Sequence, residues 1–183
     1  MTSPRLFLVT PEAIAADQIL ACVQAACAAG DVASIVTPES SITEKLQALG
    51  LAVVSPQKPQ GGNDGVHVDA AAMDIGELRK SIGKDKILGV YCAASRHAAM
   101  EAAEAGADYI AFSQNAYAPK EPIIGWWADL FEIPCVAFDP VEPKDLDILL
   151  PQNPDFIRPS DLMWTSPAEA KRVIAELTER MTA

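Results

Sequence analysis

Residues 87–113 read ILGVYCAASRHAAMEAAEAGADYIAFS, and this stretch decides the fold class. It begins with an apolar run, residues 87–92, and ends with a second apolar run, residues 109–113. Between them, Ser95 is placed to cap a helix over residues 96–105, whose alanine, glutamate and methionine residues favour helix. A glycine ends this helix. A strand, a helix and a second strand in this order predict two parallel strands joined by a crossover helix.

The same alternation recurs along the whole chain. Several of the runs are apolar throughout, as expected of parallel strands that are covered on both faces. Eight such strands are the number that closes a TIM barrel. The predicted strands cover residues 6–10, 32–37, 51–55, 65–69, 87–92, 109–113, 135–139 and 156–158, and the predicted helices include 11–29, 45–49, 96–105 and 168–181.

The length of 183 residues predicts one domain over residues 1–183, folded as a compact (βα)8 barrel with about 23 residues for each strand and helix. One unit is shorter still. Only nine residues, 56–64, separate the third and fourth strands, and they include two prolines and two glycines. A parallel crossover usually needs at least about 10–12 residues, so the third crossover helix is predicted to be missing. The alternative, a doubly wound open sheet, lacks a GxGxxG loop to support it.

The amino-acid composition limits the classes of molecule that the protein is expected to bind. Lysine and arginine number 14 against 25 aspartate and glutamate residues, a formal net charge of −11. This acidic balance argues against nucleic acid and against an anionic membrane surface. No apolar run reaches the roughly 20 residues of a membrane-spanning helix, and no signal peptide is visible. The four cysteines form no CxxC or zinc-type pair. We therefore expect a cytoplasmic protein with reduced thiols and no metal site.

Several short motifs, taken together and in order, resemble the thiamine-phosphate synthase and thiazole tautomerase family, whose members are compact (βα)8 barrels. GADYIAF at 106–112 is similar to the family's GADYIGFG, and DGVHV at 64–68 is similar to its DGVHLG. The similarity extends from about Leu6 to Ala137. It implies thiamine biosynthesis, and a transferase that joins a hydroxymethylpyrimidine diphosphate to a thiazole phosphate with loss of pyrophosphate. Departure of such a leaving group needs Mg²⁺ and basic side chains around the diphosphate.

The sequence departs from this family at the positions that perform the chemistry. The family's diphosphate clamp, its two metal-linked acids, its Pro-Thr-x-Thr-Lys run and its phosphate-binding Gly-Gly-Ile are all replaced. The tautomerase histidine is also missing. We therefore expect synthase activity to be lost or weak, with Mg²⁺ relevant only if activity survives. The replacing stretches are residues 35–39, 55–57, 70–72, 116–120 and 138–140, and the tautomerase histidine falls within 113–115.

Four residues remain as candidates for binding a small phosphorylated molecule. Lys120 and Arg158 are the basic side chains at or just past the ends of the sixth and eighth strands. Ser160 follows Arg158, and Ser95 opens a helix whose N-terminus favours anions. The alternative for Arg158 is an ion pair with a nearby aspartate, and the alternative for Ser95 is capping alone. No catalytic residue is predicted.

Other reactive residue types have simpler explanations. His67 and Asp69 leave one strand on the same face, and a buried, hydrogen-bonded role for His67 is favoured over a metal or proton-transfer role. Cys92 and Cys135 end strands but have no neighbouring histidine, so packing is favoured over nucleophilic chemistry. A non-catalytic binding barrel and a divergent enzyme of different chemistry both stay open as alternatives.

Two regions suggest a homodimer. Trp126 and Trp127 are adjacent on an apolar predicted helix, so both cannot face the barrel. The loop from Gln57 to Asn63 replaces a crossover helix, so either this loop or a partner subunit has to cover the strands beside it.

Overall fold

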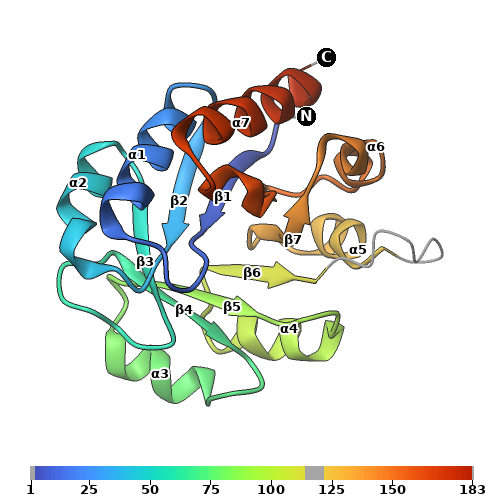
Figure 1. Cartoon of the computed structure of the whole chain (residues 1–183). Coiled ribbons are helices and arrows are strands. Elements are labelled where there is room, and N and C mark those ends of the chain that lie inside the picture. Colours follow the sequence, from blue (N-terminus) through green and yellow to red (C-terminus); the bar gives the residue numbers. More distant parts are fainter. Residues whose placement is uncertain (1–2, 114–121, 183) are drawn as a thin grey trace.

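The computed structural model describes residues 3–113 and 122–182, and its centre is a closed barrel of eight parallel strands in sequential order (Figure 1). The predicted TIM-barrel class is therefore confirmed. Each strand pairs in parallel with the next, and β1 closes the barrel by pairing with β8. The strands are β1 Arg5–Val9, β2 Val32–Val36, β3 Ala52–Pro56, β4 Gly65–Asp69, β5 Ile87–Tyr91, β6 Tyr109–Phe112, β7 Cys135–Val141 and β8 Phe156–Pro159.

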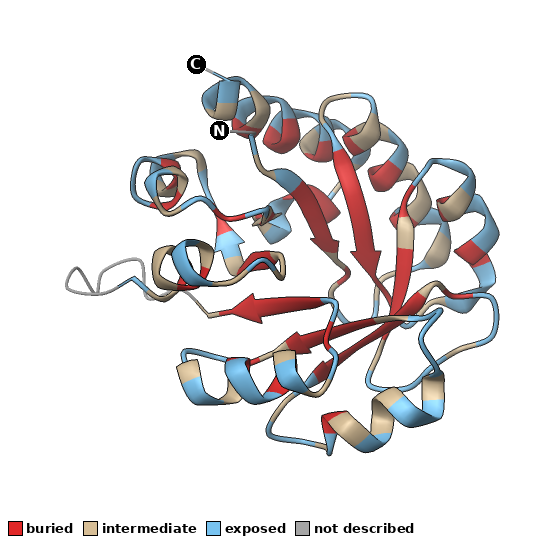
Figure 2. Cartoon of the chain, turned by 180° about the vertical axis from the view of Figure 1, so that it is seen from behind, coloured by how far each residue is buried: buried red, intermediate tan, exposed pale blue. Residues whose placement is uncertain are grey.

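The helices surround the barrel, and their buried residues face the strands (Figure 2). In chain order, the α-helices are α1 Ala16–Cys27, α2 Thr43–Ala48, α3 Ile75–Ile82, α4 Arg96–Glu104, α5 Ile123–Leu130, α6 Leu146–Leu149 and α7 Pro167–Thr182. Short 3-10 turns are η1 Ser40–Ile42, η2 Pro143–Asp145, η3 Leu150–Gln152 and η4 Asp161–Trp164. Among these described helices, none combines the length and apolarity needed to cross a membrane.

Helix starts show where the sequence prediction was right and where it was wrong. Ser95 caps α4 as predicted, since its hydroxyl accepts a hydrogen bond from the Ala98 N–H at 3.1 Å. The first helix was predicted from residue 11 but begins at Ala16, because Ala13 takes a left-handed conformation with φ of 57°. A helical start is incompatible with that conformation.

Two apolar layers build the core. The outer layer lies between strands and helices and includes Val53 and Val66, which are 0% and 1% exposed. The inner layer fills the barrel and consists of Phe7, Val36, Val54, Tyr109, Ala111 and Val136. Adjacent residues such as Val53 and Val54 fall into different layers because side chains alternate along a strand.

The third crossover helix is missing, as predicted: residues 57–64, all of which are described, contain no helix between β3 and β4. The loop itself covers the strands. Asn63 is 2% exposed, and its side-chain oxygen accepts a hydrogen bond from the hydroxyl of Thr43 at 2.8 Å. Lys86 donates to the Asn63 carbonyl at 2.5 Å. Because the β3 and β4 residues beneath it are buried within one chain, this region does not need a partner subunit to cover it.

Helix α5 resolves the roles of the two tryptophans. Trp127 is fully buried, donates from Nε1 to the Ile133 carbonyl at 2.7 Å, and stacks on Phe131 with ring centroids 4.0 Å apart. Trp126 is partly buried, and the guanidinium of Arg96 lies 4.6 Å from its ring centroid. As expected, the two do not both lie inside the core: Trp127 belongs to it, and Trp126 packs against its edge and stays partly exposed. Any dimer contact through this helix would therefore use Trp126 and not Trp127.

At the amino-terminal end of the barrel, a polar contact made by an aspartate recurs between neighbouring strands. An aspartate directly precedes each even-numbered strand. The first, Asp31, forms an ion pair with Arg5 of β1 at 2.8 Å. In the other three units the carboxylate accepts a backbone N–H of the preceding strand, in the pairs Asp64 with Val53, Asp108 with Leu88 and Asp155 with Cys135, at 2.8, 2.7 and 2.8 Å.

Candidate functional site at the carboxyl-terminal mouth

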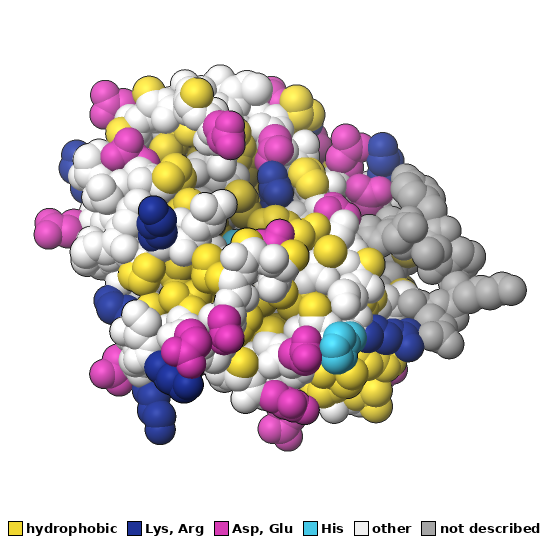
Figure 3. Space-filling view, turned by 90° about the horizontal axis from the view of Figure 1, so that it is seen from below, with side chains coloured by type: hydrophobic (Ala, Val, Ile, Leu, Met, Phe, Trp, Pro, Cys, Tyr) yellow, Lys and Arg dark blue, Asp and Glu magenta, His cyan; other side chains and the backbone are white. Residues whose placement is uncertain are grey.

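The carboxyl ends of the strands form the end of a parallel barrel at which enzymes of this architecture place their sites. Figure 3 views the molecule from the side toward which β1 and β2 point in Figure 1. Hydrophobic side chains gather over the middle of this face, and most charged side chains lie around its edge. The partly buried Tyr91 and Phe138, which pack against the inner apolar layer, add aromatic side chains to the mouth.

A buried histidine and tyrosine form the floor of the mouth. His67 of β4 is 8% exposed, and its Nδ1 lies 2.8 Å from the hydroxyl of Tyr109 on β6. The Tyr109 ring reaches His67 by crossing Gly89 of β5, where an added Cβ would lie 1.9 Å from the Tyr109 Cζ. The predicted buried, hydrogen-bonded role of His67 is confirmed. Only glycine at position 89 leaves room for this contact.

Burial keeps both of these groups neutral. Desolvation lowers the pKa of His67 to about 4; Asp69 opposes this shift and Arg158 adds to it. Desolvation also raises the pKa of the Tyr109 hydroxyl. At pH 7 the floor of the mouth therefore holds an uncharged imidazole and a protonated phenol.

Phe138 of β7 covers one face of the histidine ring. Its ring stacks on His67 with centroids 5.0 Å apart and an interplanar angle of 14°. It also contacts Tyr91, with centroids 5.1 Å apart. The guanidinium carbon of Arg158 lies 5.3 Å from its ring centroid. Phe138 therefore occupies the middle of the mouth, between the histidine and the arginine.

Arg158 is placed at the mouth by β8 and is partly neutralised. Its Nη2 forms an ion pair with Asp161 at 3.0 Å, and its side chain is 16% exposed. The predicted alternative, an ion pair with a nearby aspartate, is thus present. Its Nε is buried and, within the residues described, has no hydrogen-bond partner. One donor of the guanidinium therefore remains unused.

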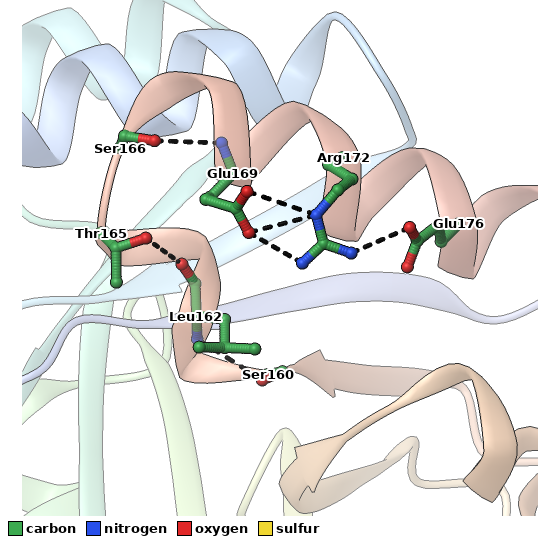
Figure 4. Close-up of polar contacts among 7 residues, drawn as sticks. All are labelled: Ser160, Leu162, Thr165, Ser166, Glu169, Arg172 and Glu176. Atoms are coloured by element: carbon green, nitrogen blue, oxygen red, sulfur yellow. Dashed lines mark hydrogen bonds and ion pairs between the residues drawn. The ribbon is translucent and has the colours of Figure 1, made fainter.

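The other predicted site residues are less closely grouped. Ser160 caps the turn η4, where its hydroxyl accepts from the Leu162 N–H at 3.4 Å (Figure 4). Ser95 follows β5, and in the described part of the chain no hydrogen bond joins it to Arg158 or Ser160. Lys120 lies outside the described residues. The structure therefore brings Arg158 and Ser160 to one loop and leaves Ser95 in another.

Sequence reasoning missed Tyr109, Gly89 and Phe138 as parts of the site. A usable signal existed for Gly89, because a glycine inside an apolar strand indicates a close approach by another group. Tyr109 and Phe138 gave no such signal, since aromatic residues in strands are usual core components. Their partners come from other strands and are visible only in the closed barrel.

Cys92 lies at the carboxyl end of a strand as predicted, directly after β5, whereas Cys135 is the first residue of β7 and so lies at the amino-terminal end of the barrel, not at the mouth. Cys92 and Cys135 are 3% and 0% exposed. Burial raises the pKa of each thiol to about 12. Both are therefore protonated at neutral pH, and a protonated thiol is a poor nucleophile.

Two carboxylates lie within the described strands at the mouth, those of Asp69 and Asp139. No group of three or more histidine, cysteine, aspartate or glutamate side chains gathers around a common point in residues 3–113 and 122–182. Asp69 accepts the Ala71 N–H at 2.8 Å, and Asp139 accepts the Ser113 hydroxyl at 2.9 Å. Mg²⁺ is usually held by one or two carboxylates together with substrate phosphates, and each of these two carboxylates already accepts a hydrogen bond from the chain.

Comparison with known proteins places this geometry in a family. The sequence model described as Thiamine monophosphate synthase matches residues 60–157. A thiamine-phosphate synthase of Rhodospirillum centenum is 33% identical, with 99% of each chain covered. The chain belongs to the thiamine-phosphate synthase family. A second relative of that name, from Erythrobacter litoralis, is 35% identical over 80% of this chain and 67% of its own length.

Solved structures agree with this family at the level of the fold. A thiamine phosphate pyrophosphorylase from Pyrococcus furiosus superposes with a TM-score of 0.77 at 17% identity, covering 98% of this chain and 96% of that chain. A 3-hexulose-6-phosphate synthase gives a TM-score of 0.68 at 14% identity, covering 96% and 99%. The chain is thus a thiamine-phosphate synthase-like barrel of thiamine biosynthesis.

Proposed function

We propose that this barrel binds a small phosphorylated molecule at its carboxyl-terminal mouth and has lost most or all synthase activity. The observation that carries the proposal is Phe138. Its ring lies against His67 at the mouth, at a position where the family resemblance implies a glycine-rich phosphate-binding turn. A side chain in that place reduces the volume in which a synthase has to hold two substrates together, whereas a single small ligand needs less room.

The charge at the mouth supports the same proposal. Loss of pyrophosphate requires several preorganised positive charges around the leaving group. Within two residues of the carboxyl ends of the described strands, the basic residues are Arg158 within β8 and the exposed Lys58, two residues after β3, and Asp161 already offsets part of the Arg158 charge. Binding one phosphate needs fewer contacts than stabilising a departing diphosphate. A barrel that has lost basic residues would therefore keep ligand binding more readily than catalysis.

Arg158 and Ser160 supply the contacts we assign to this ligand. Arg158 has a buried Nε without a partner and an Nη2 that would exchange Asp161 for the ligand. Nε and Nη2 together form the fork that binds two oxygens of a phosphate. Ser160 adds a hydroxyl two residues along the chain, and Ser95 and Lys120 are proposed as further contacts.

Activity is tested directly with the two family substrates. Incubation with hydroxymethylpyrimidine diphosphate, thiazole phosphate and Mg²⁺ is expected to give no thiamine phosphate. Turnover in the usual enzyme range of about 1–10³ per second would overturn the proposal. The Phe138→Gly variant serves as a comparison, because opening the mouth without restoring the missing cations is expected to leave the protein inactive.

Binding is tested by thermal shift with thiazole phosphate and, in parallel, with inorganic phosphate. We expect thiazole phosphate to raise the melting temperature of the wild type but not of Arg158→Ala. The matched control is Arg172→Ala: Arg172 lies on α7 between Glu169 and Glu176, at 2.7 and 2.8 Å, away from the mouth (Figure 4). An equal shift in wild type and Arg158→Ala would rule out this site.

Quaternary structure and location are further proposals. A dimer would use the part of Trp126 that Arg96 leaves accessible, so sedimentation is expected to show a dimer that Trp126→Asp weakens. A wild-type monomer would end this proposal. A cytoplasmic location is supported by the biosynthetic family, and fractionation of cells tests it.

A further inference from the structure

The hydrogen bond between His67 and Tyr109 has a direction that the surroundings determine. Within the described residues, the Tyr109 hydroxyl has one partner, the Nδ1 of His67 at 2.8 Å. Tyr109 is 8% exposed and is packed edge-on against Phe7, with ring centroids 5.4 Å apart. Phe7 offers no acceptor, and in the described part of the chain the Tyr109 hydroxyl makes no hydrogen bond to the carbonyl of Gly89. The phenolic proton therefore has only Nδ1 to bind.

Only one placement of the protons gives both the Nδ1 of His67 and the hydroxyl of Tyr109 a hydrogen-bond partner. If Nδ1 carried a proton, it would donate to the phenolic oxygen, and the phenolic proton would be buried without an acceptor. Such groups are rare in folded proteins because they lose their bond to water. If Nδ1 is unprotonated, it accepts from Tyr109 and both atoms are satisfied. A neutral imidazole then carries its single proton on Nε2.

Nε2 is at the tip of the ring and is free to bind a ligand. In the described part of the chain it has no protein partner, and it is not among the fully buried side-chain atoms without one. The charged groups that act on this ring are Asp69 and Arg158. Phe138 stacks on the ring face and is itself only partly buried.

We propose that Tyr109 is a positioning residue that holds His67 in the Nε2–H form, so that the floor of the mouth donates a hydrogen bond to an acceptor atom of the ligand. The ligand class is a small molecule with a ring nitrogen or carbonyl oxygen, together with an anionic group for Arg158. This inference rests on the proposed function for the presence of a ligand. The tautomer itself is independent of the proposed function. Burial that keeps the imidazole neutral supports it.

Nitrogen-15 NMR of the ligand-free protein tests the tautomer directly. The chain has two histidines, and His97, with 79% of its side chain exposed, serves as the internal reference. At pH 7 we expect the Nδ1 of His67 to resonate as an unprotonated acceptor and Nε2 to carry the proton in more than about nine-tenths of molecules. A proton on Nδ1 would overturn the proposal.

Two tyrosine variants separate positioning from packing. Tyr109→Phe is expected to change the His67 tautomer ratio at least about fivefold. The control Tyr91→Phe removes a hydroxyl from another ring that contacts Phe138, and it is expected to leave the ratio unchanged. An unchanged ratio in Tyr109→Phe would contradict the proposal. If that variant does not fold, the wild-type spectrum decides alone.

Titration with thiazole phosphate then distinguishes the two proposals. We expect thiazole phosphate to shift the Nε2 resonance of His67 more than inorganic phosphate does. Binding without that shift would refute the donor role and leave the proposed function standing. Absence of binding would refute the proposed function, and the ligand-free spectrum would still decide the tautomer.

Discussion

The two ends of this barrel use polar groups in opposite ways. At the amino-terminal end, charged side chains bond to the chain itself: Asp64, Asp108 and Asp155 accept backbone N–H groups, and Asp31 pairs with Arg5. At the carboxyl-terminal mouth, Arg158 keeps an unused Nε. The carboxylates at the first end join neighbouring strands, whereas at the mouth one donor of Arg158 has no partner among the described residues, as is also true of the Asn63 Nδ2 in the loop before β4.

In such barrels the amino-terminal face generally contributes to stability and the carboxyl-terminal face holds the functional site. The two ends of this barrel differ in the same way. Here the mouth is also strongly apolar, because Phe138, Tyr91 and His67 stack across it. Changes at the amino-terminal end should therefore affect folding alone. Changes at the mouth should affect folding together with protonation or ligand binding.

The largest expected effect is the pH dependence that His67 contributes. Its pKa is about 4 in the folded chain and about 6.5 when unfolded. Between these values the unfolded chain binds a proton that the folded chain does not. Stability is therefore fully present above pH 6.5 and falls by about 3 kcal/mol as the pH drops to 4.

Urea unfolding of wild type and His67→Gln from pH 7.5 to 4.5 measures this contribution. The carboxylates common to both proteins cancel in the difference between the two curves. We expect the difference to change with pH in that window. Parallel curves would show that His67 is not held neutral by burial, and would weaken the contrast between the two ends.

The second largest effect is expected from a steric clash with Tyr109, the partner of His67. Gly89→Ala places a methyl group 1.9 Å from the Cζ of Tyr109. The ring has to move, so we expect a loss of about 2–3 kcal/mol, at the upper end of the range for overpacked cores. Loss of the His67–Tyr109 bond should appear at the same time in the His67 nitrogen-15 shifts. An unfolding curve equal to wild type would contradict the packing described.

The third prediction examines the amino-terminal end. Asp108→Ala removes the carboxylate partner of Arg79, which keeps its hydrogen bonds to backbone carbonyls, and leaves the buried N–H of Leu88 unpaired. An unpaired buried donor costs about 1–3 kcal/mol, so we expect a loss of about 2 kcal/mol in urea unfolding without change in ligand binding. The control Asp147→Ala breaks an exposed pair with Arg180 and should change little. A binding defect in Asp108→Ala would show that the two ends are coupled.

The smallest effect is expected at the other ion pair of that end. Arg5 and Asp31 have side chains that are 49% and 68% exposed. Exposed pairs contribute little because water screens them. Arg5→Gln should cost about 0.5 kcal/mol, and added salt should reduce the difference from wild type. A loss near that of Asp108→Ala would mean that the pair is far less screened than its exposure indicates.

Much of the fold could be read from local sequence signals. Apolar runs predicted all eight strands to within a few residues, because a strand buried on both faces has to be apolar along its length. Ser95 predicted the start of α4 through its capping hydroxyl, and the prolines and glycines around residues 56–64 predicted the missing helix. Ala13 was missed, since its left-handed conformation has no signal in an alanine.

The candidate site was harder to predict, because its contacts join residues that are far apart in sequence. Arg158 and Ser160 could be placed at the mouth from their position after a strand. Their neighbours could not: Phe138 and Asp161 determine how much of the arginine charge remains available. For His67, burial could be predicted, but its partner Tyr109 is 42 positions away.

The sequence by itself determined the barrel, its missing helix and the family, because periodicity, turn residues and short motifs are local properties of the chain. Tertiary structure decided the character of the mouth. Pairing of three neighbouring strands brings His67, Gly89 and Tyr109 into contact. Closure of the barrel adds Phe7 and Phe138 around them, and burial then sets the charge of the histidine. Solvation and packing at a point depend on every strand around it, so the chemistry of this site follows from the closed barrel and not from any single segment.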